Sequence, residues 1–412
     1  MAQAYREFGG GSPILVVLNK IDEHPGFEVN RRFLQEKYPG IKGFYRLSCA
    51  TDEGLEAFIT ALQQALMTVE LLHTAWPQSW FDVKTALERM KANYISYAKY
   101  RKVCGQCGIA ETTAQETLVE FLHDLGVSLH FKDLALLETQ VLRPKWVTQA
   151  VYQIINSPQL ARGRGILPLA GLHEILTPAR VYPRDKHPYL VDLMKKFELC
   201  YELDRERVLV PDLLEVQEPA FDFPYETALQ FRLEYDFLPR AIMPRFIVRR
   251  HQDIRDELRW RTGVVLHNPD LQTTAVVKSD DEAKTIAIWV QGERRREYFA
   301  IIRHTLQEIH RSFEKLLVTE LVPLPDYPAI TVEYQELIGL EQMGKTHLPI
   351  GKLRQEYRVK DLLNGISSEQ ARQAELEDLR DEKLHRMHKA RILANDPTEK
   401  FRLEKLIEEE EA

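Results

Sequence analysis

The sequence predicts a multidomain protein that combines an α/β segment, a mainly helical part and an α+β region with an antiparallel sheet. Three observations predict these classes. Strand and helix patterns alternate through residues 12–73, helical patterns dominate residues 80–228, and residues 229–330 combine several alternating strands with one long amphipathic helix. A chain of 412 residues has room for about two to four domains, so all three parts can coexist.

In the α/β segment the pattern is strand, helix, strand, helix, which predicts a parallel sheet. The side chains of Ile14–Leu18 are apolar on both faces of the expected strand, which predicts that helices cover it on both sides. A short helix is expected near residues 31–38, and a second strand at Phe44–Leu47. The last helix is amphipathic, and the positions expected to face inward are Leu55, Phe58, Leu62, Leu66 and Val69.

The mainly helical part contains a helix that carries Leu118 and Leu122 and is followed by Gly126. Glycine adopts the left-handed conformation that ends helices, so the helix is expected to stop there. Short strands are predicted at Val127–Phe131 and Thr139–Leu142, and Pro144 begins another helix. Helix, strand, strand, helix at this spacing indicates a winged-helix-like unit.

The α+β region predicts a sheet and a helix that packs on it. Strands are expected at Leu229–Tyr235, Val264–His267, Thr274–Val277 and Thr285–Val290. The apolar positions from Phe299 to Phe313 are spaced by three and four residues, which predicts the helix. More large apolar groups are present than one modest core needs, which indicates an interface in this region; they are Ile242, Phe246, Trp260 and Trp289. Residues 331–412 are expected to form a helical, charged tail.

Charge and composition disfavour several classes of function. The net charge is −7, from 55 basic and 62 acidic residues, so the whole-chain field repels nucleic-acid backbones and acidic membranes, and neither partner is expected. No apolar run reaches the roughly 20 residues of a membrane span, and the N-terminus does not resemble a signal peptide. Four cysteines are too few to stabilise a chain of this size through disulfide bonds, which fits a reducing compartment. A cytoplasmic protein is therefore expected.

The tetrapeptide Asn19-Lys20-Ile21-Asp22 directly follows the first predicted strand. Open α/β sheets bind ligands at the carboxyl ends of their strands. At that edge the Asp22 carboxylate can accept two parallel hydrogen bonds from the N1 and N2 hydrogens of guanine, a donor pair that adenine lacks. Lys20 can lay its aliphatic stem along the base, and Asn19 can tie the loop to neighbouring backbone.

A second loop follows the next predicted strand and contains Ser48, Cys49 and Ala50. It is placed so that a backbone N–H can meet the guanine O6. Together the two loops predict a guanine-binding site, and no catalytic or metal-binding residue is assigned in this chain. The alternative is an ordinary polar loop in which Asp22 caps the next helical turn.

Residues Gly339–Thr346 match the phosphate-loop pattern G-x-x-x-x-G-K-[ST]. Such a loop requires a strand before it and a helix after it. The residues from Tyr334 onward predict a helix instead, and Pro349 interrupts the position of the following helix. We therefore interpret the match as a helix that ends at Gly344.

One cysteine pair is better explained by local structure than by metal binding. Cys104 and Cys107 have the spacing of a zinc half-site, with His123 and His130 as candidate partners, but no second cysteine pair follows, so a boundary between helix and loop is favoured.

The three consecutive arginines Arg294, Arg295 and Arg296 begin the long helix of the α+β region, where cations oppose the helix dipole. Compensation by Glu293 and Glu297 is favoured over a carboxylate from a partner.

These features resemble the Roco family, in which a Ras-like GTPase domain called Roc is fused to a domain called COR. The loops around Asp22 and Cys49 resemble the fourth and fifth motifs of small GTP-binding proteins. The other specific stretches are Phe121–Val127, Leu142–Trp146, Phe197–Tyr201, Leu209–Pro211, Tyr235–Arg240 and Arg245–Val248. Bacterial members are the most similar, and the animal leucine-rich-repeat kinases share the tandem, although this chain has no protein-kinase signature.

The resemblance implies a division of the chain. Residues 1–73 would be the C-terminal half of the Ras-like Roc domain, and residues 74–228 the winged-helix-like N-terminal subdomain of COR. Residues 229–330 would be the C-terminal α+β subdomain of COR, which dimerises, followed by the tail at 331–412. The resemblance also implies GTP or GDP with Mg²⁺ in the complete protein, a homodimer and an intramolecular Roc partner.

The chain departs from the family at the phosphate end of the pocket, because no glycine-rich loop, magnesium-holding Ser or Thr, or switch precedes Asn19. We therefore expect this chain alone neither to bind GTP tightly nor to hydrolyse it. Two functions follow from these patterns. One is a dimerisation and regulatory module of a Roco GTPase; the other is a bacterial interaction scaffold that binds a protein or nucleic acid through its winged-helix-like and α+β units.

Overall fold

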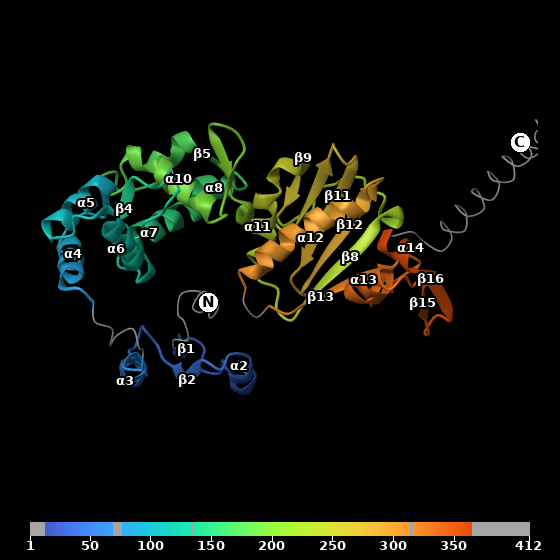
Figure 1. Ribbon diagram of the computed structural model, residues 1–412, viewed down its shortest axis with the longest axis horizontal. Helices are drawn as coiled ribbons and strands as arrows, with labels where there is room; N and C mark the ends of the chain where they lie inside the picture. The colour runs from blue at the N-terminus through green and yellow to red at the C-terminus, as the bar shows by residue number, and fades with distance from the viewer. Residues whose placement is uncertain (1–12, 69–75, 134, 314–315, 365–412) are drawn as a thin grey trace, which may run out of the picture. The chain divides into compact units, whose positions relative to one another are not determined.

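The computed structural model describes residues 13–68, 76–133, 135–313 and 316–364. The chain divides into two compact units (Figure 1): the described residues up to Phe197 belong to the first, and most residues from Leu209 onward belong to the second. Within these ranges, no helix is long and apolar enough to cross a bilayer.

The N-terminal segment has the predicted order of strand, helix, strand, helix. Its elements are β1 (Ile14–Leu18), α2 (Arg31–Lys37), β2 (Ile41–Arg46) and α3 (Leu55–Leu66). The two strands pair in parallel, with Leu18 opposite Arg46. Asn30 begins α2, because its side chain accepts a hydrogen bond from the Phe33 N–H at 3.0 Å. The prediction of a parallel α/β arrangement is therefore confirmed.

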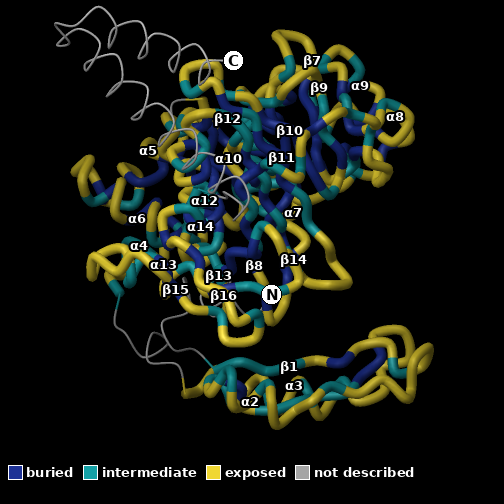
Figure 2. The backbone as a smooth tube through the Cα atoms, turned by 90° about the vertical axis from the view of Figure 1, so that its right-hand side faces the viewer, coloured by how far each residue is buried: buried dark blue, intermediate teal, exposed yellow. Residues whose placement is uncertain are grey.

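The burial predicted for this segment is wrong within the described residues. Strand β1 is mostly half-buried rather than covered on both faces (Figure 2). Leu62 and Leu66 of α3 are 38% and 47% exposed. The physical reason is that two strands and two short helices shield little apolar surface. Val69, which was also expected to face inward, lies outside the described residues.

The rest of the first unit consists of short helices and small strands. Its elements are α4 (Gln78–Glu88), β3 (Tyr94–Ser96), α5 (Tyr97–Gln106), α6 (Thr112–Asp124), β4 (Thr139–Val141), α7 (Pro144–Ile155), α8 (Pro158–Arg162), β5 (Ile166–Pro168), α9 (Leu172–Ile175) and α10 (His187–Lys196). Strands β6 (Tyr201–Glu202) and β7 (Arg207–Leu209) follow along the chain. Buried side chains of α4, α5 and α6, among them Leu87, Tyr100 and Leu122, share one core.

Most predictions for this part are confirmed and one is wrong. Pro144 begins helix α7, as expected. Gly126 lies directly beyond the end of α6 with a φ of 67°, and the strand predicted at Thr139–Leu142 is β4. The strand predicted at Val127–Phe131 is absent from the described elements, since these residues contribute an isolated bridge between Leu129 and Val141. Strand β4 pairs instead with β3, whose three residues are too few to show a periodic pattern. The winged-helix-like arrangement stays a prediction.

The second unit is built on a seven-stranded antiparallel sheet of order β14-β13-β8-β12-β11-β10-β9. The strands are β8 (Leu229–Tyr235), β9 (Ile254–Trp260), β10 (Gly263–Asn268), β11 (Thr273–Asp280), β12 (Thr285–Gly292), β13 (Val318–Leu324) and β14 (Tyr327–Glu333). The remaining elements are α11 (Ile242–Arg249), α12 (Arg295–Arg311), α13 (Tyr334–Gln342), α14 (Val359–Asn364) and the hairpin of β15 (His347–Ile350) and β16 (Gln355–Arg358).

Helix α12 lies across one face of this sheet (Figure 1). The predicted positions Phe299, Ile302, Leu306 and Ile309 are buried, whereas Phe313 lies beyond the helix end at Arg311. The Phe299 ring centre lies 4.5 Å from that of Phe231 of β8. The four predicted strands and the helix are thus confirmed. Strands β9, β13 and β14 were not predicted, because charged residues such as Asp256 and Glu257 interrupt the first, and the prolines Pro323 and Pro328 interrupt the other two.

The large apolar residues that the sequence analysis assigned to an interface pack inside this unit. Ile242 and Phe246 are fully buried, and Trp260 is 2% exposed. Trp289 packs against the cluster that contains Trp260 and Val276. These residues therefore carry no argument for an interface, although the dimer itself stays a prediction.

Lys278 of β11 is enclosed by aromatic rings from the sheet and from the segment that precedes it. Its ammonium lies 5.0 Å from the centre of the Tyr225 ring and 5.6 to 5.9 Å from the centres of the Phe221, Trp260 and Trp289 rings. It also lies 2.7 Å from the Glu218 carboxylate. Cation–π attraction and the ion pair together fasten the segment from Glu218 to Tyr225 onto the sheet.

The chain remains folded beyond residue 331, where the sequence placed the start of a helical tail. Strand β14, helix α13, the β15–β16 hairpin and helix α14 continue to Asn364. Leu337, Leu348, Tyr357 and Leu362 are buried, so this stretch contributes apolar side chains to a core. The sequence analysis missed the hairpin because each of its strands is only four residues long, Pro349 interrupts β15, and β16 is mostly polar. The remainder of the predicted tail, residues 365–412, lies outside the described residues.

Candidate functional site

The two loops that the sequence singled out begin at the same edge of the parallel sheet. Each follows the carboxyl end of its strand, and the last residues of the strands, Leu18 and Arg46, are register partners. The loops are joined by backbone hydrogen bonds, from the Leu47 N–H to the Leu18 carbonyl at 3.0 Å and from the Ile21 N–H to the Leu47 carbonyl at 3.4 Å. Side chains on the two loops therefore lie close together although about 30 residues separate them.

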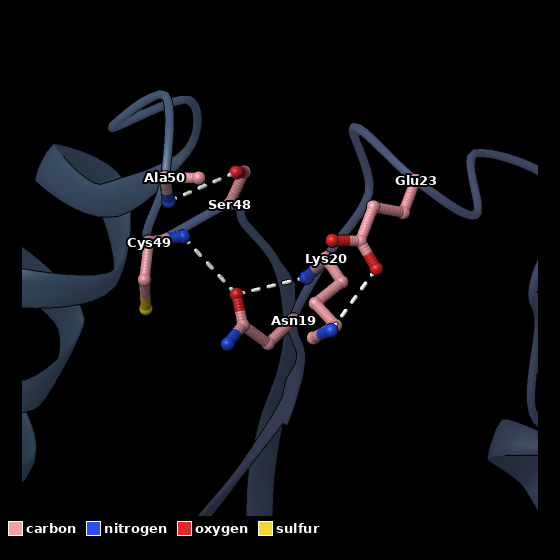
Figure 3. Close-up of polar contacts among 6 residues, drawn as sticks. All are labelled: Asn19, Lys20, Glu23, Ser48, Cys49 and Ala50. Atoms are coloured by element: carbon pink, nitrogen blue, oxygen red, sulfur yellow. Dashed lines mark hydrogen bonds and ion pairs between the residues drawn. The ribbon is translucent and has the colours of Figure 1, made fainter.

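Asn19 connects the loops through its side chain (Figure 3). Its Oδ1 atom accepts hydrogen bonds from the Lys20 N–H at 2.8 Å and from the Cys49 N–H at 3.1 Å. One amide oxygen thus holds backbone of both loops, which is the role that the sequence predicted for Asn19.

Asp22 presents an ionised carboxylate to solvent. The Ser48 hydroxyl beside it is the main cause that holds the pKa of this carboxyl below its ordinary value, and the backbone of its own loop and Lys20 act in the same direction. Ser48 itself is fully buried, and its Oγ accepts from the N–H groups of Ala50 and Thr51, each at 3.2 Å. Asn30 rather than Asp22 caps helix α2, while the Asp22 carboxylate contacts the backbone of its own turn, as in the alternative of an ordinary polar loop.

Lys20 is held in an unusual backbone conformation, with a φ of 65°. Its carbonyl accepts from the N–H groups of Glu23 at 3.1 Å and His24 at 2.9 Å, which closes a tight turn. Its ammonium forms an ion pair with Glu23 at 3.0 Å (Figure 3), and both side chains are more than half exposed. Sequence reasoning missed Glu23, although its spacing of three residues from Lys20 was a usable signal.

The structure thus brings together all six residues that the sequence proposed for guanine binding: Asn19, Lys20, Asp22, Ser48, Cys49 and Ala50. The Asp22 carboxylate already contacts the Ser48 hydroxyl and the backbone of its own loop, so two parallel N–H donors would have to use its remaining lone pairs. The N–H groups of Cys49 and Ala50, however, already donate to Asn19 and Ser48. A contact between either N–H and the guanine O6 would share or replace those bonds.

The match to a phosphate loop at Gly339–Thr346 lies at the end of helix α13. Gly344 has a φ of 69°, and the Lys345 N–H donates to the Leu340 carbonyl at 2.9 Å, which is the hydrogen bonding of a helix C-terminus. Strand β15 follows, where a phosphate loop requires a helix. The interpretation as a helix end is confirmed.

The cysteine pair also lies at a helix end. Cys104 is buried within α5, and Cys107 is its C-terminal cap. The described residues contain no group of three or more His, Cys, Asp or Glu side chains that could hold a metal ion. His123 accepts the backbone N–H of His130 at its Nδ1, and the His130 ring stacks on Tyr97, so these histidines serve packing.

The arginine run at the start of α12 is compensated within its own unit. Arg294 pairs with Glu297 at 3.3 Å, as the sequence suggested. Arg296 forms two hydrogen bonds with Glu341 of α13, at 2.8 and 2.6 Å, a partner that no local pattern indicated. Arg295 donates to the Thr227 carbonyl at 2.9 Å. The run therefore anchors neighbouring segments within the second unit.

Family comparison matches most of the chain outside its N-terminal segment. The family model described as "C-terminal of Roc, COR-A domain" matches residues 77–214, and the model described as "C-terminal of Roc, COR-B domain" matches residues 226–365. The segment that carries Phe221 and Tyr225 thus falls between the two models for the most part, yet it packs with the second unit.

Several known proteins are similar to this chain. A Roc-COR-CHAT protease of Runella zeae is 27% identical over 338 residues, which cover 79% of this chain and 35% of that protein. The probable serine/threonine-protein kinase pats1 of Dictyostelium discoideum is 24% identical over 68% of this chain and 10% of its own length. A solved structure of Methanosarcina barkeri Roco2, the RocCORdC form bound to GDP, is 53% identical, covers 51% of this chain and 67% of that chain, and has a TM-score of 0.44. The chain thus spans about a third or less of the length of these curated relatives.

Proposed function

This chain belongs to the Roco family, with the C-terminal part of Roc followed by COR, and from that premise we propose that it is the dimerisation and regulatory module of a Roco-type GTPase. In this proposal the N-terminal segment recognises guanine through Asn19, Lys20, Asp22, Ser48, Cys49 and Ala50. The observation that carries the proposal is the Asn19 side chain, which joins the two loops beside the ionised Asp22 carboxylate.

Binding of the phosphates and of Mg²⁺ is assigned to residues of the complete protein outside this chain. Phosphoryl transfer depends on a phosphate-cradling loop, a metal ion and a positioned water, and the described residues offer a base-binding edge without these groups. GTP binding and hydrolysis would therefore belong to the complete protein. The role of COR would be to couple the nucleotide state to association between chains.

We expect this 412-residue chain to bind GDP and GTP no more tightly than the high micromolar range, because phosphate and magnesium contacts supply most of the affinity and of the transition-state stabilisation. Titration calorimetry in magnesium buffer, with this chain and with the full-length product of the gene, measures both affinities. The proposed function requires tight binding by the full-length protein. Tight, saturable binding by this chain would instead contradict the assignment of the phosphate site to residues outside it.

We also propose that the chain forms a symmetric homodimer through its second unit, within residues 229–330. Sedimentation of the full chain should show a dimer, and cross-linking of a mixture of ¹⁴N- and ¹⁵N-labelled chains should yield inter-chain links in that region, where the exposed Lys284 offers a reactive amine. A monomer at high micromolar concentration would contradict the dimer. Inter-chain links confined to the first unit would contradict its location.

The proposed compartment is the cytoplasm. All four cysteines, Cys49, Cys104, Cys107 and Cys200, are free thiols, and free thiols persist in a reducing environment.

A further inference from the structure

Arg46 joins the two loops of the candidate guanine site through contacts that no sequence pattern indicated. It is the last residue of β2 and lies opposite Leu18, which precedes Asn19. Its guanidinium donates to the carbonyl of Pro25 and to the carboxylate of Glu28, both of which follow Asp22 in the first loop. The Arg46 side chain is 32% exposed and that of Glu28 is 51% exposed, so the arginine end of this pair is the one that is partly shielded from water.

The backbone of Arg46 is in contact with the second loop. Gly54 closes that loop with a φ of 75°, and a β-carbon at this position would lie 2.2 Å from the Arg46 carbonyl oxygen. The loop therefore returns directly over Arg46, and glycine is required for this close approach. Within the same loop the Ser48 N–H donates to the Glu53 carbonyl at 2.9 Å, which holds Ser48 beside Asp22.

The hydrogen bonds inside the first loop are local. The Lys20 carbonyl accepts from Glu23 and His24, and the His24 carbonyl accepts from the Phe27 N–H at 3.2 Å. These bonds shape consecutive turns but do not connect residues 25–28 to the sheet. Arg46 supplies a direct hydrogen-bonded connection, because its guanidinium reaches from the sheet edge across 18 or more positions of sequence. Arg31 of α2 also pairs with Glu28 at 3.2 Å and lies over the Phe44 ring of β2, which is a weaker contact with the sheet.

We propose that Arg46 is a positioning residue for guanine recognition: it holds the Pro25–Glu28 segment against the sheet edge and thereby keeps the Asp22 carboxylate in register with Ser48, Cys49 and Ala50. This inference rests on the proposed function and deepens it. In this proposal Arg46 acts through its contacts with Pro25 and Glu28 rather than by contact with the base. Its effect passes through Asp22, which bears the two acceptor oxygens for guanine.

The test compares GDP with IDP in the full-length protein, because hypoxanthine lacks the 2-amino group and makes one hydrogen bond fewer to Asp22. Arg46→Ala should speed GDP release about three- to tenfold, as expected for the loss of a charge-assisted, partly shielded pair. It should reduce the preference for GDP over IDP by a similar factor. Arg46→Lys, which keeps the charge but not the two-pronged geometry, should lie between the wild type and Arg46→Ala.

Arg32→Ala is the matched control, since Arg32 pairs with Glu36 on α2 and its side chain is 90% exposed. It should leave both release rates unchanged. Equal acceleration of GDP and IDP release in Arg46→Ala would show a structural role alone and overturn the inference, as would unchanged rates. A wild-type protein that binds no GDP would overturn the proposed function itself.

A measurement without nucleotide separates the two failures. Amide hydrogen exchange of this 412-residue chain should become faster at residues 20–28 in Arg46→Ala and remain unchanged there in Arg32→Ala. Unchanged exchange in Arg46→Ala would show that Arg46 does not hold the loop, whatever the protein binds.

Discussion

Asp22→Asn in the full-length protein should weaken GDP binding on the order of 100-fold, because the substitution removes an ionised acceptor of two hydrogen bonds and leaves the N1 and N2 hydrogens of guanine poorly matched. The structure sharpens this expectation, since Ser48 and the loop backbone hold the pKa of Asp22 below its ordinary value and keep the carboxylate ionised at neutral pH. Competition between labelled GDP and unlabelled nucleotides measures the change.

The same substitution should improve the binding of xanthosine diphosphate, which presents a carbonyl where guanine has an amine. The Asn side chain can donate to that carbonyl, whereas the Asp22 carboxylate repels it. Asp52→Asn is the control, because Asp52 is an exposed carboxylate of the second loop that is not among the six proposed guanine-binding residues, and it should change neither affinity. An unaltered GDP affinity in Asp22→Asn would mean that Asp22 does not face the base.

Glu198→Ala should lower the free energy of unfolding of the second unit by about 2–4 kcal/mol, since removing one partner of a shielded ion pair costs more than the pair contributes. The Glu198 carboxylate accepts from Arg245 and, at 2.6 Å, from Arg249, both on helix α11. The three side chains are 20%, 22% and 29% exposed, so water replaces these contacts poorly. Calorimetric unfolding of the full chain measures the change.

Two companion variants separate charge from backbone strain at this position. Glu198 has a φ of 56°, which glycine adopts without cost, so Glu198→Gly should be less destabilising than Glu198→Ala by about 1 kcal/mol. Glu282→Ala, at an exposed glutamate of the turn between β11 and β12, should have little effect. If Glu198→Ala unfolds at the same temperature as the wild type, the pairing with α11 contributes nothing to stability.

The sequence by itself determined the features that depend on a few neighbouring residues. The run Ile14–Leu18 specified β1, Gly126 and Gly344 specified helix ends through their left-handed backbone, and the spacing from Phe299 to Ile309 specified α12. The candidate site belongs to the same category, because its six residues occupy two short loops directly after predicted strands. Such features can be predicted from the sequence because turns, caps and periodic faces are formed by residues within about four positions of each other.

Only the tertiary structure decided which residues become partners across long separations. Arg46 pairs with Glu28, Arg296 with Glu341, and Lys278 with four aromatic rings, and none of these pairs shares a local pattern. It also decided that Phe246 and Trp260 are core rather than surface, and that residues 331–364 complete the second unit instead of forming a tail. The physical reason is that strand pairing, burial and ion pairing depend on chain segments that meet only in the folded state, so the local sequence of β9 or β15 carries too little of the energy that stabilises it.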